Sequence, residues 1–561
     1  MKNIVSNCFV IISFIILFNL AACSWEDSYK AAAKRSLQVD TDLILVPYPY
    51  NIFDKEARES ITLSHYTKDE LKEILLEHNL SWEELKLDWG WNEKEQHFER
   101  EVNYTSHYTN YSYDINIPIW IFGQKWFNNG IYPDTIFQQH IPSIYSKILK
   151  YKFSNVLDIS SYDKIFKNTN EIPEIIVTIV VDQGGEQLYK AHPNGFPFLK
   201  TLKNESVYFK NARVGHLEAH TAVGHAAIGT GSFPKEMKTF SNEIYAWKDG
   251  KVTSKTVYQG NDSQLNLEEF STLSLADVWD RDEDNHPVII SQCYAARASI
   301  GMAGHGLLIP QLLRSDRLSD KDFVYWANSK SLLWDTFNPA YSMPDGINKY
   351  DFYEFYQANK QNISSNFKAE NRLDFTRKFH HFQASEFQVA LDGETFRNSL
   401  QSELISRKAF KDGKTDLAFL TLKATDAVGH LYGWESQESE KILIATDMEI
   451  RKIFDFLRSH YGDSFILLVT ADHGAAPMPE VSKASFLTHE IFFKELSELL
   501  PPTAREKQSV VKWITHSHLS LNREVMSAYK ISEADVIEKI KSIKINSKPF
   551  FRKVWNRGDL D

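Results

Sequence analysis

Several short stretches of the chain consist almost entirely of apolar residues. The clearest is Ile175 to Val181, and Asp416 to Leu422 and Phe465 to Thr470 have the same character. Near-continuous apolar runs of this length are typical of strands that helices cover on both faces, as in a parallel sheet. The pattern therefore predicts an α/β fold, with a mostly parallel sheet sandwiched by helices. The stretch from Leu307 to Leu404, which is rich in aromatic and polar residues, predicts an inserted cap lobe.

Each of these runs leads into acidic or imidazole side chains. In chain order they are Asp182 after the first run, Asp426 and His430 after the second, and Asp472 and His473 after the third. Strands of a parallel sheet end at one rim, so we expect these side chains to lie together. Any one of them alone is better interpreted as a helix cap or a buried core residue. As a set they suit paired zinc ions, which can clamp the attacking and leaving oxygens of a displacement at phosphorus.

A threonine at the start of a small-residue helix is the candidate nucleophile. Thr221 opens the segment Thr-Ala-Val-Gly-His-Ala-Ala-Ile-Gly-Thr-Gly. A helix start presents free backbone N–H groups and the positive end of the helix dipole to a phosphoryl group. The β-branched side chain has a restricted rotamer, which helps to hold the hydroxyl in line for attack.

These motifs resemble those of the alkaline phosphatase superfamily, and specifically its nucleotide pyrophosphatase/phosphodiesterase and threonine-nucleophile phosphatase branches. The matching segments are Val-Val-Asp182, residues 221–231, Ser241-Asn242-Glu243 with Tyr245, Asp426-Ala-Val-Gly-His430 and Thr470-Ala-Asp472-His473-Gly474. The resemblance implies an alkaline phosphatase-like fold, a phosphate ester substrate and two divalent metal ions, expected to be Zn²⁺.

The resemblance also implies roles for individual residues. One zinc is expected between Asp182, Thr221, Asp472 and His473. The other is expected to bind Asp426, His430 and one further histidine. The Asn242 amide is expected to steady a phosphoryl oxygen.

The further histidine normally lies after the Asp-His-Gly motif in this family, just before a strand that ends in glycine. His516 and His518 lie downstream of that motif but lack such a strand. The expected pattern instead lies near the amino terminus, where residues 105–123 contain Thr105-Ser-His107 and end in Ile-Trp-Ile-Phe-Gly123. We therefore expect His107 to complete the second zinc site in a circularly permuted chain. Folds whose termini lie close together at the surface tolerate such rewiring.

The permutation defines the expected domain organisation. The predicted parts are a lipoprotein signal peptide (1–22), a tether (23–39), the permuted C-terminal part of the hydrolase core (40–157), a linker (158–173) and the N-terminal part of the core (174–561), with cap insertions at about 307–404 and 479–544.

One departure from the family pattern bears on the substrate. Threonine-nucleophile monoesterases of the family carry a Lys-x-Arg pair where this chain has Ala295 and Arg297. Loss of a cation near the terminal phosphoryl oxygens weakens recognition of a dianionic monoester more than of a monoanionic diester. The predicted function is therefore a zinc-dependent phosphodiesterase of the nucleotide pyrophosphatase type, with Arg297 at the phosphoryl group. A phosphate monoesterase of the same superfamily is the alternative, and another cation reaching the same place would favour it.

A different class of function also fits the fold. A non-catalytic surface lipoprotein that uses the fold as a binding scaffold would contain no metal and show no turnover. The formal net charge of −11 and the lack of a long basic run argue against binding to a nucleic-acid polymer. Composition does not indicate an oligomeric state.

The amino terminus indicates a compartment. Lys2 precedes an apolar run over residues 9–20, which is too short for a stable membrane span and is followed by Leu20-Ala-Ala-Cys23. This resembles a bacterial lipoprotein signal cleaved before Cys23, with lipidation of that cysteine. Ser24 lacks the acidic character associated with inner-membrane retention. The expected location is the bacterial cell envelope, with a lipid anchor in the outer membrane facing the periplasm.

Overall fold

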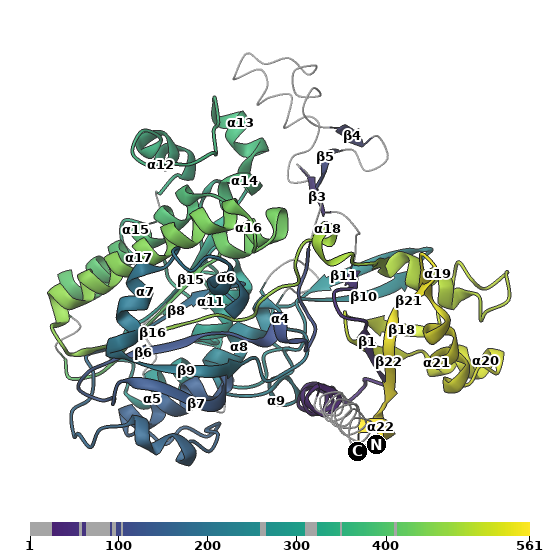
Figure 1. Cartoon of the computed structure of the whole chain (residues 1–561), viewed down its shortest axis with the longest axis horizontal. Helices are drawn as coiled ribbons and strands as arrows, with labels where there is room; N and C mark the ends of the chain where they lie inside the picture. Colours follow the sequence, from purple (N-terminus) through teal and green to yellow (C-terminus); the bar gives the residue numbers. More distant parts are fainter. Residues whose placement is uncertain are drawn as a thin grey trace, which may run out of the picture.

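A nine-stranded sheet forms the larger of two lobes (Figure 1). The computed structural model describes residues 25–54, 59–62, 90–92, 97–102, 105–258, 265–308, 322–347, 350–408 and 412–560. The predicted signal peptide and Cys23 lie outside these residues. In sheet order the strands are β14 (Leu333–Asp335), β13 (Phe323–Asn328), β12 (Ile289–Cys293), β15 (Asp416–Leu422), β8 (Ile175–Val181), β16 (Phe465–Thr470), β6 (Ile119–Phe122), β9 (Ser206–Arg213) and β7 (Gly130–Phe137).

The sheet is mostly parallel, as the apolar runs predicted. Strands β13, β12, β15, β8 and β16 form an unbroken parallel series. Strand β6 runs antiparallel to both β16 and β9, and β14 runs antiparallel to β13. Every residue of β8, β15 and β16 is buried, which explains why their sequences show no polar alternation.

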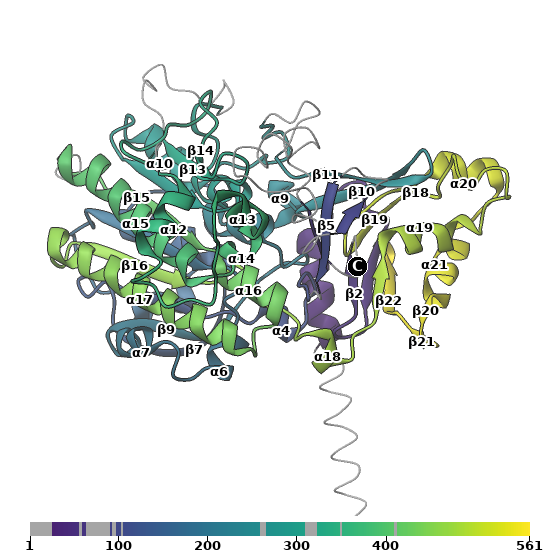
Figure 2. The same ribbon diagram turned by 90° about the horizontal axis from the view of Figure 1, so that it is seen from above.

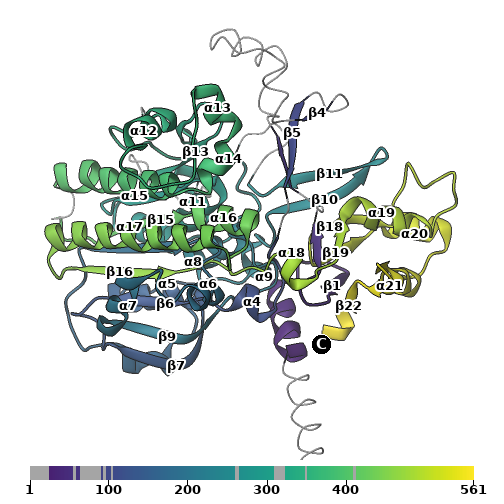
Figure 3. The same cartoon turned by 45° about the horizontal axis from the view of Figure 1, so that its top comes forward.

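Helices cover both faces of the sheet and create two separate hydrophobic cores (Figures 1 and 3). One core contains Ile176 and Val180 of β8, whereas the other contains Ile175, Val177 and Ile179. On the first face lie α5 (Ile141–Leu149), α8 (Thr221–Thr230), α10 (Leu275–Asp282) and α11 (Ala296–Ala303). On the second lie α6 (Glu186–Ala191), α7 (Pro197–Leu202), α12 (Phe352–Asn359), α13 (Arg372–Arg377), α14 (Phe379–Gln383), α15 (Glu386–Leu400) and α17 (Gln437–Tyr461), with α16 (Ala424–Tyr432) beside them.

The second lobe is built on a six-stranded antiparallel sheet and lies beside the first (Figure 2). Its strands, in order, are β11 (Lys251–Thr256), β10 (Glu243–Lys248), β18 (Val511–Ile514), β19 (His518–Leu521), β1 (Leu43–Pro47) and β22 (Phe551–Asn556). Helices α19 (His489–Ser497), α20 (Arg523–Tyr529) and α21 (Glu533–Ser542) complete this lobe.

Shorter elements connect these parts. They are β2 (Ile52–Asp54), β3 (Glu59–Thr62), β4 (Gly90–Asn92), β5 (His97–Val102), α4 (Ser112–Ile115), η1 (Gln138–His140), η2 (Ser160–Ile165), η3 (Lys203–Glu205), α9 (Pro234–Met237), η4 (Gly306–Leu308), η6 (Gln401–Ser406), α18 (Pro479–Ser482), β17 (Phe486–Thr488), β20 (Lys544–Ile545), β21 (Lys548–Pro549) and α22 (Arg557–Leu560). Among the helices of the described residues, none is both long enough and apolar enough to cross a bilayer.

Segments from the two ends of the chain pair with each other. Strand β1 runs antiparallel to β22, and the Arg557 guanidinium donates hydrogen bonds to the backbone carbonyls of Gln38 and Thr41. Strand β6 lies in the same sheet as β8, although residues 175–181 follow it by a long stretch of chain. Both arrangements agree with the sequence-based expectation for a permuted chain.

Four of the expected segments have the following structure in the folded chain. The expected tether includes a helix over residues 25–36 that buries Tyr29 and Ala33, and the expected linker buries Tyr162 and Ile165. Within the expected cap at 307–404, β13 and β14 extend the main sheet, so α12 to α15 form the covering layer. The segment 479–544 belongs to the second lobe, whose sheet also takes strands from residues 43–47 and 551–556.

The first residue of β15 makes the stability of the core dependent on pH. Burial raises the pKa of Asp416 to about 8. One carboxyl oxygen accepts a hydrogen bond from the Val288 backbone N–H at 2.8 Å, whereas the other is buried without a hydrogen-bond partner among the described residues. An unfolded Asp has a pKa of about 3.9, so between about pH 4 and pH 8 the folded state binds more protons and stability falls as pH rises.

Replacing Asp416 with asparagine should remove this dependence, because the amide keeps the acceptor for Val288 and carries no charge. We expect the variant to be more stable than the wild type at pH 9, by on the order of 1–3 kcal/mol, and the difference to shrink toward pH 5. Urea unfolding of both proteins across this range measures the effect. If the free energies of unfolding of the two proteins changed with pH in parallel, the Asp416 carboxyl would not make the stability depend on pH, and the prediction would be wrong.

Candidate active site

The carboxyl ends of three adjacent strands carry the predicted metal ligands to one rim. In the sheet register, Val181 of β8 lies opposite Leu422 of β15, and Thr470 of β16 lies opposite Val180. The residues that follow each strand therefore emerge at the same level. They bring Asp182, Asp426, His430, Asp472 and His473 to one end of the sheet, as the strand pattern predicted.

Asp182, Asp472 and His473 form a first fully buried group. Nε2 of His473 lies 3.1 Å from an oxygen of Asp472 and 3.6 Å from one of Asp182. These three atoms have no hydrogen-bond partner among the described residues. Burial and the Asp472 carboxylate raise the pKa of Asp182 to about 7. Burial lowers the pKa of His473, but the two carboxylates outweigh it and raise this pKa to about 9. The raised pKa values of both residues show that the two carboxylates need additional positive charge nearby.

His107, Asp426 and His430 form a second group. Nε2 of His107 and Nε2 of His430 lie 3.4 and 3.3 Å from the same Asp426 oxygen. Nδ1 of His107 contacts the Ala219 carbonyl at 2.7 Å, and Nδ1 of His430 contacts the Thr105 carbonyl at 2.5 Å. Since a carbonyl only accepts, each Nδ1 carries the proton and each Nε2 keeps its lone pair for the group.

The two groups fit a pair of divalent cations. Each offers imidazole nitrogen and carboxylate oxygen, which are zinc ligands, and in each group the ligand atoms lie within 4.8 Å of one another. The orphaned atoms of the first group and the fixed tautomers of the second are the features expected of ligands held ready for a metal. His107 joins the second group from a segment far away in the chain, as the sequence predicted.

Thr221 is the first residue of α8, and its surroundings match those expected of a nucleophile. It is buried and lines the same cavity as His107 and Asp426. The Ala222 backbone N–H donates to the Asn242 side-chain oxygen at 2.9 Å. This bond orients the amide so that its nitrogen remains as the donor. A Cβ on Gly224 would lie 2.8 Å from the Asp472 side chain, so only glycine lets α8 approach the end of β16 this closely.

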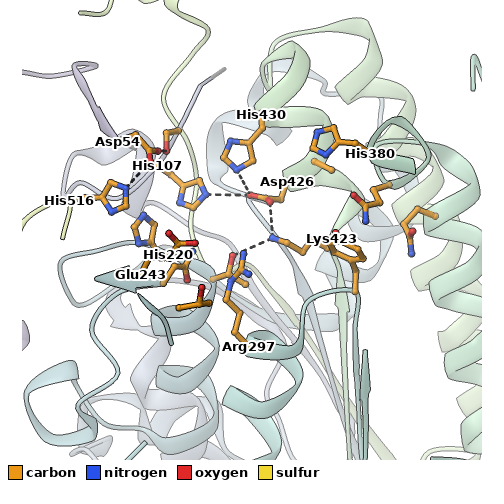
Figure 4. Close-up of a pocket in the computed structure, with 18 of the residues that line it drawn as sticks. Asp54, His107, His220, Glu243, Arg297, His380, Lys423, Asp426, His430 and His516 are labelled. Atoms are coloured by element: carbon orange, nitrogen blue, oxygen red, sulfur yellow. Dashed lines mark hydrogen bonds and ion pairs between the residues drawn. The ribbon is translucent and has the colours of Figure 1, made fainter. Parts of the chain in front are cut away.

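A buried lysine that the sequence reasoning missed lies at the centre of the site (Figure 4). Nζ of Lys423 lies 2.9 Å from Asp182 Oδ2, 2.7 Å from Asp426 Oδ2 and 3.3 Å from Thr221 Oγ1. Both aspartates keep Oδ1 for the histidines described above. Burial lowers the pKa of Lys423, but the two carboxylates outweigh it and raise the pKa above the ordinary value, so the ammonium stays charged. A lysine directly after a strand that is almost entirely apolar was the available signal, because lysine is rarely buried without a partner.

Arg297 brings a second cation to the same cavity. It is the second residue of α11 and points toward Lys423 in Figure 4. Its Nε is buried without a hydrogen-bond partner among the described residues. The cavity has a volume of about 420 Å³, and residues of both lobes line it. The candidate nucleophile, two cations and the second carboxylate–histidine group therefore line one space that can hold a phosphoryl group, and Lys423 connects this space to Asp182 of the first group.

Comparison with known proteins identifies the family of this chain. Residues 176–561 match the family model "Type I phosphodiesterase / nucleotide pyrophosphatase". Alkaline phosphatase PhoV of Synechococcus elongatus is 24% identical over 347 residues, covering 56% of this chain and 61% of that protein. Alkaline phosphatase PafA of Elizabethkingia meningoseptica is 21% identical over 407 residues, covering 66% of this chain and 73% of that protein.

A further relative and a solved structure are also similar to this chain. A protein of Myroides odoratus named "Calcium-transporting ATPase" is 23% identical over 417 residues, covering 65% of this chain and 72% of that protein. A crystal structure of wild-type alkaline phosphatase PafA superimposes with a TM-score of 0.54 at 18% identity, covering 67% of this chain and 77% of that chain, which shows the shared fold. The chain belongs to the type I phosphodiesterase / nucleotide pyrophosphatase family of phosphoric ester hydrolases, within the alkaline phosphatase superfamily.

Proposed function

We propose that this protein is a phosphate monoester hydrolase that uses Thr221 as its nucleophile. The observation that carries the proposal is the position of Lys423 Nζ, 3.3 Å from the Thr221 hydroxyl oxygen. The sequence argument for a diesterase rested on Ala295, where related monoesterases carry lysine. In the folded chain, a lysine from a different element supplies an ammonium group beside the nucleophile. Alkaline phosphatases among the relatives also favour a monoester substrate.

The charge of the substrate explains why two cations matter. A phosphate monoester carries up to two negative charges on its terminal oxygens, whereas a diester carries one. Lys423 and Arg297 together match the dianion, and Arg297 can bind two phosphoryl oxygens through its fork of N–H donors. Because Lys423 is buried, its interaction with a phosphoryl oxygen is stronger than it would be at a surface. The diesterase interpretation loses its main support when the second cation is present.

The chemistry assigned to the site's own residues is a two-step displacement. The Thr221 oxygen attacks phosphorus, and the alcohol departs on the opposite side, which leaves phosphothreonine. The N–H groups at the start of α8 and the Asn242 amide donate to the phosphoryl oxygens. Water then hydrolyses the phosphothreonine and releases inorganic phosphate.

Two divalent ions, best matched by zinc, are proposed for the two ligand groups described above. Asp182, Asp472 and His473 would hold one beside Thr221, and His107, Asp426 and His430 would hold the other. Bound there, they would lower the pKa of the hydroxyl and stabilise the leaving oxygen. Lys423 bridges the two groups through the remaining aspartate oxygens, so it keeps these ligands in place and reduces the repulsion between their charges.

The test compares a chromogenic phosphate monoester with the matching diester. We expect a higher kcat/KM for the monoester. Lys423→Ala should lower kcat/KM for the monoester by roughly 10- to 100-fold, as expected for the loss of about 1.5–3 kcal/mol from a charge-assisted contact, and should lower it less for the diester.

Lys414→Ala is the matched control, because Lys414 precedes β15 as Lys423 follows it and pairs with Glu283 away from the cavity. It should leave both rates unchanged. A wild-type enzyme that prefers the diester would contradict the monoesterase proposal and restore the phosphodiesterase alternative suggested by the family name.

Chain order and location remain proposals as well. His107 and β6 lie outside the residues that match the family model, yet they complete the sheet and the second ligand group, which supports a circular permutation. The lipid anchor on Cys23 and the outer-membrane location are proposed from the amino-terminal sequence alone.

A further inference from the structure

A third group of potential metal ligands lies beside the nucleophile, outside the two groups discussed above. It consists of Glu218, His220 and His516, all buried, with ligand atoms within 4.8 Å of one another. Glu218 and His220 precede α8 in the larger lobe. His516 lies in the turn between β18 and β19 of the second lobe. Figure 4 shows His220 and His516 on the same side of the cavity as His107.

The spacing within this third group matches that of the second group. Nδ1 of His220 and Nδ1 of His516 each lie 3.4 Å from the same oxygen of Glu218, Oε2. The corresponding distances to Asp426 are 3.4 and 3.3 Å. Ligands at about 2.0–2.1 Å from a tetrahedral zinc lie roughly 3.3–3.4 Å apart, so a common cation accounts for these separations.

The two imidazole nitrogens that face Glu218 Oε2 lack other partners in the described part of the chain, whereas Oε2 also accepts a hydrogen bond from the Ser241 hydroxyl at 3.3 Å. Nδ1 of both histidines is buried without a hydrogen-bond partner among the described residues. The other Glu218 oxygen, Oε1, accepts from the Thr515 hydroxyl at 2.7 Å and from the Ser517 backbone N–H at 2.5 Å. These bonds hold the carboxylate so that Oε2 points to the imidazoles.

Two further features indicate that these side chains are positioned to bind a metal ion. His516 Nε2 lies 3.3 Å from an Asp54 carboxylate oxygen, which is the outer-shell arrangement that orients a metal-binding histidine and leaves its other nitrogen for the metal. Glu218 has a φ of +55°, an uncommon conformation for a residue with a side chain. Such a backbone conformation costs energy and is found mainly where a side chain must be held in a particular place.

We propose that Glu218, His220 and His516 bind a third divalent cation of the zinc type. Two imidazole nitrogens and one carboxylate oxygen favour zinc over magnesium or calcium, which prefer oxygen ligands. The cation joins the two lobes, because His516 comes from the second lobe and the other ligands come from the larger one. It also fixes the residue directly before Thr221. This site is independent of whether the substrate is a monoester or a diester.

The test is metal analysis of the full chain, saturated with zinc and freed of excess. We expect three zinc ions per wild-type chain and two in both His516→Ala and Glu218→Gln. The matched control is His489→Ala, which removes another buried histidine of the same lobe and should retain three. His107→Ala should also bind two, but it should lose activity far more than His516→Ala does.

A stability measurement separates loss of the metal from loss of folding. Adding zinc to metal-depleted protein should raise the Tm of the wild type and of His107→Ala more than that of His516→Ala, because only the third cation links the lobes. Two zinc ions in the wild type, with none lost in His516→Ala or Glu218→Gln, would overturn the proposal. The group would then be a metal-free ion cluster in which a protonated His516 lies between Asp54 and Glu218.

Discussion

Thr221→Ala should abolish almost all turnover, with kcat for a phosphate monoester falling by at least about 10³- to 10⁴-fold. The reason is that Thr221 Oγ1 is the only hydroxyl that lies both at the start of α8 and beside Lys423 among the described residues. The same loss is expected for a diester, because one oxygen attacks in either case. Steady-state rates with both substrates measure the effect.

Thr221→Ser is the informative control, because it keeps the hydroxyl and loses only a methyl group. It should retain far more activity than the alanine variant, with some loss because the serine rotamer is less restricted. Acid quenching during turnover, followed by peptide mass spectrometry, should detect phosphate on Thr221 in the wild type. Substantial activity in Thr221→Ala, or phosphate on a different residue, would refute the assigned mechanism.

His107→Ala should remove one zinc ion per chain and lower kcat/KM by roughly 10²- to 10³-fold. The side chain supplies one of the two imidazoles that face Asp426, so its loss leaves that group with a single histidine and a carboxylate. Elemental analysis and kinetics on the same preparation measure both effects. The residue lies outside the part of the chain that matches the family model, which makes this variant a direct test of the permuted arrangement.

His140→Ala provides a control from the same amino-terminal segment. His140 is half-buried, contacts Phe137 and belongs to none of the ligand groups among the described residues. It should keep the wild-type zinc content and activity. If His107→Ala behaves like this control, His107 is a packed core residue and the second ligand group is incomplete.

Residues of both lobes line the candidate active site. The larger lobe contributes Thr221, Lys423 and Arg297, whereas Asp54, Tyr245 and His516 line the cavity from the second lobe and the strand beside it. Helix α14 closes another side with His380 and Gln383. Changes in the second lobe are therefore able to alter substrate binding without touching the nucleophile.

Local sequence determined most of the candidate catalytic rim. Strand β8 is recognisable because all its residues are buried, and Asp182 directly follows it. The same holds for β16 with Asp472 and His473. In each case the strand and its functional residue are adjacent in the chain, so their positions in space follow from one element. The position of Thr221 also follows from its own element. Its small-residue helix contains Gly224, which allows the helix to pack closely against Asp472.

Tertiary structure alone decided the remaining parts. Lys423 reaches Thr221 only because β15 ends beside α8, and nothing in the spacing of these residues shows that contact. His516 reaches Glu218 because β18 and β19 form a hairpin in a sheet that also takes strands from both ends of the described chain. Such contacts depend on how separate elements pack, and packing is set by the summed burial of many side chains. A local pattern predicts an element and its adjacent residues, whereas the meeting of distant side chains is a property of the whole fold.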